Sequence, residues 1–201
     1  MQRDSSTEDR ILASARKIFL DRGLEGARMQ DIADDAGINK ALLHYYFRNK
    51  EKLFDTIFVQ VVDEFLPRIF AILNGDQPLF EKIKLFCSEY IGQIIQTPYV
   101  PMFIIQEVNR DPQRFIKKVM HGKHPPFQKI IAQINQEIKQ GIIKPTNPVQ
   151  LLLNIISLCI FPFLARPMIQ TVTGMSNKDF FHLMEQRSEE VCSMIIYSIK
   201  A

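Results

Sequence analysis

Apolar residues recur every three or four positions along most of this chain, while sustained alternation of apolar and polar residues is scarce. The first spacing places apolar side chains on one face of an α-helix, whereas a strand repeats every two residues. The sequence therefore predicts an all-α protein with about nine helices. Glycines and proline-containing breaks separate them, as at Gly23, Gly141 and Asn147-Pro148. Pro67 and Pro162 are expected to interrupt or bend helices, and Pro167 to bend or end one.

Residues 29–50 predict two short helices joined by a tight turn. Ile32 and Ala36 fall on one face of the first helix. Gly37 follows where that helix should stop, because glycine adopts the left-handed backbone conformation without a steric cost. Asn39 is a residue type that caps the N-terminus of a following helix well.

The second helix of this pair covers residues 40–47, and Leu43 and Phe47 are expected to face inward. The side chains then left largely outside are Lys40, Ala41, His44 and Tyr45. This is the organisation of a helix-turn-helix, whose second helix enters the major groove of DNA. The alternative is a surface αα-hairpin without nucleic acid, since helix–glycine–helix patterns are common.

The segment MQDIADDAGINKALLHYYFRNKEKLF closely resembles the N-terminal signature of the TetR (tetracycline-repressor-like) family of bacterial transcriptional regulators. The resemblance begins near Ser6 and spans roughly fifty residues. The positions that carry it are Ile11, Ala15, Phe19, Gly23, Ile32, Ala33, Gly37, Lys40, Leu43, Tyr45, Phe47, Lys50, Glu51 and Leu53. The resemblance implies a three-helix DNA-binding head in residues 1–53 and a ligand-binding and dimerisation domain in residues 54–201. Leu42 and His44 depart from the family pattern, so the operator sequence cannot be taken from a relative.

Each expected DNA contact has a chemical role. Lys40 can donate to guanine or to phosphate, and its alternative is a solvated surface lysine. Gln30 can donate to phosphate or reach a base edge, as the resemblance implies. Ala41 and Leu42 offer apolar surface for thymine methyl groups, although Leu42 is equally well a core residue. Phosphate contacts are implied for His44, Tyr45, Tyr46 and Lys50, with inward packing as the alternative for Tyr46.

The charge balance alone does not indicate a nucleic-acid partner. The 201 residues include 25 Lys and Arg against 22 Asp and Glu, a net charge of +3. Residues 1–53 contain 10 basic and 9 acidic side chains, a net charge of +1. DNA binding must therefore depend on where the cations lie rather than on their number.

Residues 145–165 contain no charged side chain, and this segment approaches membrane-spanning length. Polar residues and prolines interrupt it, so we expect a helix buried in a core and a subunit interface. The resemblance implies a homodimer formed by the last two long helices, about 148–165 and 177–199, which would place two heads in successive major grooves. The residues that face either the partner or the core are Val191, Ile195 and Ile199.

The resemblance also implies an internal ligand pocket in residues 54–201, but the ligand contacts vary too much in the family to be carried over. Aromatic and methionine side chains favour an apolar or aromatic small-molecule effector, although each is otherwise an ordinary core residue. The candidate pocket residues are Phe86, Tyr90, Met102, Phe103, Phe127 and Phe161.

Other chemistry is weakly indicated. His121 and His124 lack an evident third ligand, so we expect no metal and no cofactor. No nucleophile–base set, phosphate loop or paired carboxylates stand out, so we expect no enzyme. The three cysteines are expected to be buried free thiols in a reducing cytosol. The polar N-terminus is unlike a signal peptide, which favours a cytoplasmic location.

The resulting hypothesis is a ligand-responsive DNA-binding transcriptional regulator, more specifically a repressor released from a palindromic operator by a small molecule. The alternative is a helical protein-interaction or membrane-associated module anchored by residues 145–165. The sequence does not specify the operator, the effector, the target genes, or repression as against activation.

Overall fold

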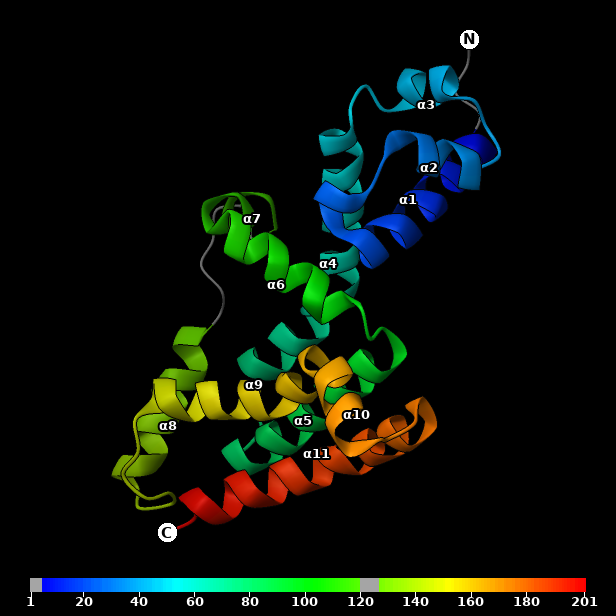
Figure 1. The fold of residues 1–201 in the computed structure, drawn as a ribbon. Helices are drawn as coiled ribbons and strands as arrows, with labels where there is room; N and C mark the ends of the chain where they lie inside the picture. The colour runs from blue at the N-terminus through cyan, green and yellow to red at the C-terminus, as the bar shows by residue number, and fades with distance from the viewer. Residues whose placement is uncertain (1–4, 120–126) are drawn as a thin grey trace. The chain divides into compact units, whose positions relative to one another are not determined.

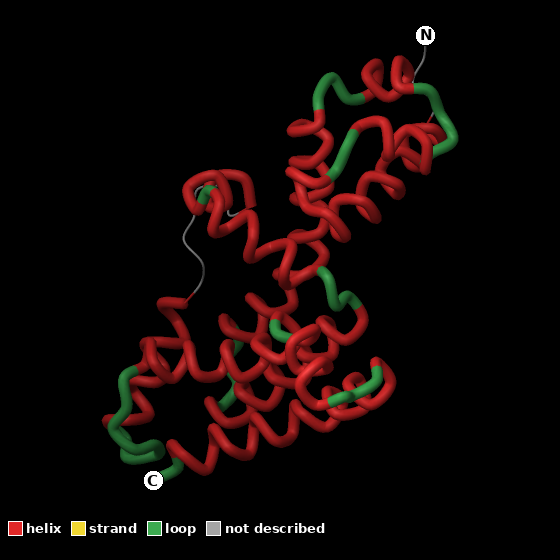
Figure 2. Tube along the Cα trace, viewed as in Figure 1, coloured by secondary structure: helices red, strands yellow, loops and turns green. Residues whose placement is uncertain are grey.

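The computed structural model describes residues 5–119 and 127–201, and Figure 2 shows that these residues are helical apart from short connecting segments. Eleven helices occur in this part of the chain (Figure 1). They are α1 (Ser5–Gly26), α2 (Met29–Asp35), α3 (Lys40–Tyr46), α4 (Lys50–Asn74), α5 (Leu79–Gln96), α6 (Val100–Arg110), α7 (Pro112–Val119), α8 (Phe127–Lys139), α9 (Pro148–Leu164), α10 (Arg166–Thr173) and α11 (Asn177–Ile199). The predicted all-α class is confirmed, and the expected count of about nine helices was too low.

Two prolines act differently from expectation, and the second explains part of the difference in helix count. Pro67 lies inside α4, which continues to Asn74 instead of stopping. Pro167 was expected to bend or end a helix, but it stands in the first turn of α10. Proline is tolerated there because the first N–H groups of a helix have no partner within the helix. The sequence pattern therefore marked the end of α9 and missed the helix that begins directly after it.

The helices form two compact units. The first contains residues 5–64 and 102–119, and the second contains residues 65–101 and 127–201. This division describes packing, whereas the expected boundary between residues 53 and 54 concerns function. The functional boundary therefore stays a prediction.

The core of the first unit brings α1, α2, α3 and the start of α4 together. Ile11, Ile32 and Leu43 are fully buried. The rings of Phe19 and Phe54 meet edge to face, with their centroids 5.0 Å apart. An edge-to-face contact between buried aromatic rings stabilises packing beyond the area it buries. This contact joins α1 to α4 and fixes a frame on which α2 and α3 rest.

The second unit is built on α5, α9 and α11, which pack against one another (Figure 1). Leu151, Ile155 and Phe180 are among its buried core residues. Cys87 of α5 and Cys159 of α9 lie in this core with their Sγ atoms 3.8 Å apart. All three cysteines are buried free thiols, as expected from their apolar surroundings.

Residues 145–165 were the one segment for which a membrane span had to be considered. No single helix in the described ranges is long and apolar enough to cross a membrane. Only α9 and α10 taken together meet the requirement for length and composition, and the two are bent by 65° at their junction.

We predict that Asn39→Ala loosens α3. The side-chain Oδ1 of Asn39 accepts a hydrogen bond from the Leu42 N–H at 2.8 Å. Loss of such a cap costs about 1 kcal/mol, or roughly a fivefold change in an opening equilibrium. Amide hydrogen exchange in α3 should therefore speed up by about that factor in Asn39→Ala. Asn39→Asp keeps a capping oxygen and should exchange like the wild type; equal exchange in all three proteins would show that the cap contributes nothing.

Candidate functional site

The turn between α2 and α3 is closed by backbone hydrogen bonds. The Gly37 N–H donates to the Asp34 carbonyl at 3.2 Å, and the Ile38 N–H donates to the Ala33 carbonyl at 3.0 Å. This pair of bonds is the Schellman motif, which requires a left-handed residue after the helix. Gly37 supplies it with φ of +66°. The turn thus fixes the direction in which α3 leaves α2.

The two faces of α3 have different environments. Leu43 and Tyr46 are buried, and they hold the helix against the head. Leu42 is half-buried. The residues of α3 that remain exposed are Lys40, Ala41, His44 and Tyr45. The four exposed residues are those expected to face outward. Tyr46 is buried in the core instead, so its side chain does not face the surface where DNA was expected to bind.

Among the expected DNA contacts, the side chains of Lys50 and Gln30 donate hydrogen bonds within the protein. The Nζ atom of Lys50 donates to the Ala27 carbonyl at 3.1 Å, which ties the start of α4 to the segment before α2. The side-chain amide of Gln30 donates to Asp34 at 2.7 Å. A phosphate group would therefore have to share or replace these bonds, whereas Lys40 is simply exposed at the start of α3.

Carboxylates on α2 are paired with cations on α1. The Lys17 Nζ atom lies 2.6 Å from Asp35, and the Arg22 guanidinium lies 2.8 Å from Asp31. The hydrogen bond from Lys17 lowers the pKa of Asp35, so this carboxylate stays ionised at neutral pH. Pairing reduces the repulsion that these acidic side chains would otherwise exert on a phosphate backbone.

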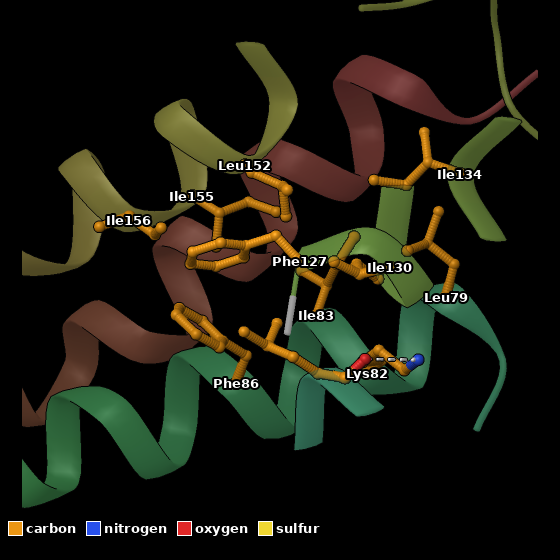
Figure 3. A pocket seen from close by; sticks show the side chains of 11 residues that line it. Leu79, Lys82, Ile83, Phe86, Phe127, Ile130, Ile134, Leu152, Ile155 and Ile156 are labelled. Atoms are coloured by element: carbon orange, nitrogen blue, oxygen red, sulfur yellow. Dashed lines mark hydrogen bonds between the residues drawn. The ribbon is translucent and has the colours of Figure 1, made fainter. Parts of the chain in front are cut away.

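The second unit contains a small apolar cavity (Figure 3). Its volume is about 20 Å³. The residues that line it come from α4, α5, α8 and α9: Leu73, Leu79, Lys82, Ile83, Phe86, Phe127, Ile130, Ile134, Leu152, Ile155 and Ile156. A volume of this size holds about one water molecule. An organic ligand can therefore enter only if the walls move apart.

Lys82 is the charged member of this lining, and it was not singled out from the sequence. Its Nζ atom donates to the carbonyl groups of Leu73 at 3.3 Å and Gly75 at 2.8 Å, and to Oε1 of Gln133 at 2.6 Å. Figure 3 shows the bond to Leu73 and places the lysine stem along the cavity wall. Burial lowers the pKa of Lys82 because it penalises the charged form.

The structure brings together only part of the expected pocket. Phe86 and Phe127 line the cavity, and Tyr90 is a buried neighbour of Phe86 at a ring distance of 5.2 Å. Phe103 instead packs in the first unit, 5.3 Å from the ring of Phe54. Met102 is 40% exposed and Phe161 is 57% exposed, so neither lines the cavity.

His121 and His124 lie outside the described residues. Within residues 5–119 and 127–201, no group of three or more His, Cys, Asp or Glu side chains is arranged to hold a metal ion.

Residues 11–57 match the family described as bacterial regulatory proteins, tetR family. The N-terminal head of this chain is a TetR-family DNA-binding domain. The matched residues run from α1 into α4 and contain the whole helix-turn-helix. The resemblance inferred from the sequence is therefore confirmed, and the chain is a DNA-binding transcriptional regulator rather than an enzyme.

Relatives extend the likeness beyond the head. RutR of Escherichia coli K12, an HTH-type transcriptional regulator, is 26% identical over 198 residues, which cover 98% of this chain and 92% of RutR. The transcriptional repressor KstR2 of Mycolicibacterium smegmatis is 30% identical over 104 residues, about half of each chain (51% and 50%). The solved structure of AibR with isovaleryl coenzyme A and operator DNA superimposes with a TM-score of 0.71 at 20% identity, over 94% of this chain and 97% of AibR. That likeness shows a shared fold across both units.

We predict that Lys40→Ala weakens DNA binding without loosening the fold. Loss of one base or phosphate contact should cost about 1–3 kcal/mol in operator affinity and make binding less sensitive to salt. Anisotropy titrations at several salt concentrations, with a duplex selected by the protein from random sequences, would measure both effects. Lys139→Ala on α8, also exposed, is the matched control. An unchanged affinity and salt slope for Lys40→Ala would exclude Lys40 from the interface.

Proposed function

We propose that this chain is a ligand-responsive repressor that binds a palindromic operator as a homodimer. One observation carries the proposal: α3 exposes Lys40, Ala41, His44 and Tyr45 while Leu43 anchors the helix in the head. A short helix with one buried face and one polar face is suited to lie in a major groove. The repressor KstR2 supports the assignment to repression.

The exposed side chains of α3 are proposed to make two kinds of contact, with bases and with phosphates. Lys40 is proposed to contact a guanine or a phosphate, and Ala41 the methyl group of a thymine. His44, Tyr45 and Lys50 are proposed to contact phosphates and so to fix the register on DNA. Tyr46 is withdrawn from this group because it is only 8% exposed. The proposed role of Leu42 is packing at the base of the helix, since the residue is half-buried.

The proposed dimer uses the outer faces of α9 and α11. Val191, Ile195 and Ile199 are buried within the protomer, so they are core residues rather than partner contacts. The large apolar residues exposed on these helices are Val149, Leu153, Phe161, Leu183, Met194 and Tyr197. Their spacings of 4 and 8 residues on α9 and of 11 and 3 residues on α11 are sums of threes and fours, so each helix has an apolar stripe. Exposed stripes of this kind favour burial against a second copy.

The effector is proposed to enter the cavity between α5, α8 and α9. All of its lining except Lys82 is apolar, which favours an aliphatic or aromatic ligand. AibR was solved with isovaleryl coenzyme A, whose acyl part is a short branched chain. Because the cavity is nearly closed, a ligand can bind only a rearranged form of the second unit. Binding would then shift the population toward a form that does not hold DNA.

The test of this function is operator retention and its release. A duplex selected by the protein from random sequences should be inverted-repeat in form, be retained in a gel shift, and be released by an aliphatic or aromatic compound. Selection of a site without two-fold symmetry would contradict the dimer. Retention that no compound of either kind reverses would contradict effector control.

We predict that Tyr197→Glu and Leu153→Glu each disrupt the dimer. Both side chains are exposed in the protomer, at 85% and 51%, so a glutamate is tolerated there but would be buried without a partner in the dimer. Sedimentation velocity at micromolar concentration should show monomers, and operator affinity should fall by at least tenfold because a single head binds weakly. Leu85→Glu on α5, 42% exposed, is the control that should remain dimeric. Variants that sediment like the wild type would place the interface elsewhere.

A further inference from the structure

Lys82 lines the apolar cavity with its aliphatic stem, and its buried ammonium group lies beyond the lining, on the carbonyl groups of Leu73 and Gly75 and the side chain of Gln133. The Lys82 side chain is 1% exposed, and the cavity wall around it is otherwise apolar. A buried cation is unfavourable unless charged or polar partners replace the water it loses. The partners that Lys82 has therefore decide what a ligand would gain by reaching it.

All three hydrogen-bond acceptors of Lys82 are uncharged. Two are the carbonyl groups of Leu73 and Gly75, and the third is the side-chain amide of Gln133. The carboxylates nearby are engaged elsewhere. Glu137 accepts from the Leu79 N–H at 3.2 Å and from Gln133 at 3.1 Å, and Asp76 pairs with Lys129 at 2.6 Å.

Among the described residues, none forms an ion pair with Lys82. The cation is therefore held by neutral groups alone, and the hydrogen bonds of a charged donor are stronger when the acceptor is charged as well.

Gln133 is the acceptor that ligand entry would remove. It lies on α8, and α8 also supplies Phe127, Ile130 and Ile134 to the cavity wall. The other two acceptors are backbone groups at and just beyond the end of α4. A cavity of about 20 Å³ must widen before an organic molecule enters. Displacement of α8 would widen it and would at the same time free one donor of Lys82.

We propose that the effector is a monocarboxylic acid whose apolar body fills the widened cavity and whose carboxylate takes the place of the Gln133 side chain at Lys82. This inference rests on the proposed function, because it assumes that the cavity is the effector site. The carboxylate supplies a charged acceptor for a buried ammonium group whose three present acceptors are all neutral. A thioester carbonyl or a hydroxyl group is neutral and would replace Gln133 without adding charge.

The experiment compares the binding affinities of carboxylic acids with those of alcohols that have the same carbon skeleton. Calorimetric titrations of the full chain would use dodecanoic acid against dodecan-1-ol, and 4-phenylbutanoic acid against 4-phenylbutan-1-ol. In at least one pair the acid should bind on the order of tenfold more tightly, which is the advantage of a charged over a neutral hydrogen-bond partner in a buried site. Equal affinities in both pairs, or no binding of either acid, would overturn the proposal. Dodecanoyl coenzyme A provides a third arm, and tighter binding of this thioester than of the free acid would overturn it as well.

Two variants tie the preference to Lys82. Lys82→Met keeps an unbranched apolar stem and removes the charge, so the alcohol should still bind while the preference for the acid is lost. Gln133→Glu supplies a carboxylate from the protein itself and should also remove the preference, without deleting Lys82 in case Lys82→Met does not fold. Gln136→Glu, exposed on the same helix, is the matched control and should keep the preference. A preference for the acid that survives in Gln133→Glu or in folded Lys82→Met would overturn the proposal.

Failure of this inference differs from failure of the proposed function. If the alcohols release operator DNA as effectively as the acids, the chain is still a ligand-responsive regulator and only the role of Lys82 is wrong. If operator DNA is not retained at all, the proposed function itself fails.

Discussion

The DNA-binding surface depends on the burial of Leu43. The helix α3 has 7 residues, and isolated helices shorter than about 12–15 residues are marginal in water. Its helical form must therefore come from the head, through Leu43 at 0% exposure, the Asn39 cap and the turn at Gly37. These contacts therefore also fix the positions of the exposed α3 residues on the opposite face, which are Lys40, Ala41, His44 and Tyr45. If this exposed face binds DNA as proposed, a change inside the head core would weaken binding as a change on the surface would.

The uncharged character of α9 follows from having two apolar faces. Leu151, Ile155 and Cys159 are buried in the second unit, while Leu153 and Phe161 are exposed on the other side. A helix that serves a core on one side and, as proposed, a partner on the other has few positions left for charge. The same property made residues 145–165 look nearly long enough for a membrane. In the structure α9 ends at Leu164, and the chain bends by 65° into α10.

Local sequence signals predicted the turn and the cap at the start of α3, whereas the lining of the cavity could be predicted only in part. The cap expected at Asn39 occurs, and Asn147 and Ser176 cap α9 and α11 in the same way, because a cap needs only a backbone N–H two or three residues away. The lining of the cavity depends on which helices meet, and no spacing along the chain states that. All four of Phe86, Phe103, Phe127 and Phe161 are phenylalanines in apolar helical segments, but only Phe86 and Phe127 line the cavity. Lys82 was overlooked for the same reason, since a lysine in an amphipathic helix ordinarily faces water.

The closed cavity bears directly on how an effector could act. A ligand shifts a conformational equilibrium only by the difference in its affinity for the two states, however tightly it binds one of them. A cavity of about 20 Å³ has no room for an organic molecule, so the proposed effector would bind a widened state in preference to the closed one. Within the second unit, the proposed effector would also reach α4 through Lys82, because the other two acceptors of Lys82, Leu73 and Gly75, lie at and just beyond the end of that helix.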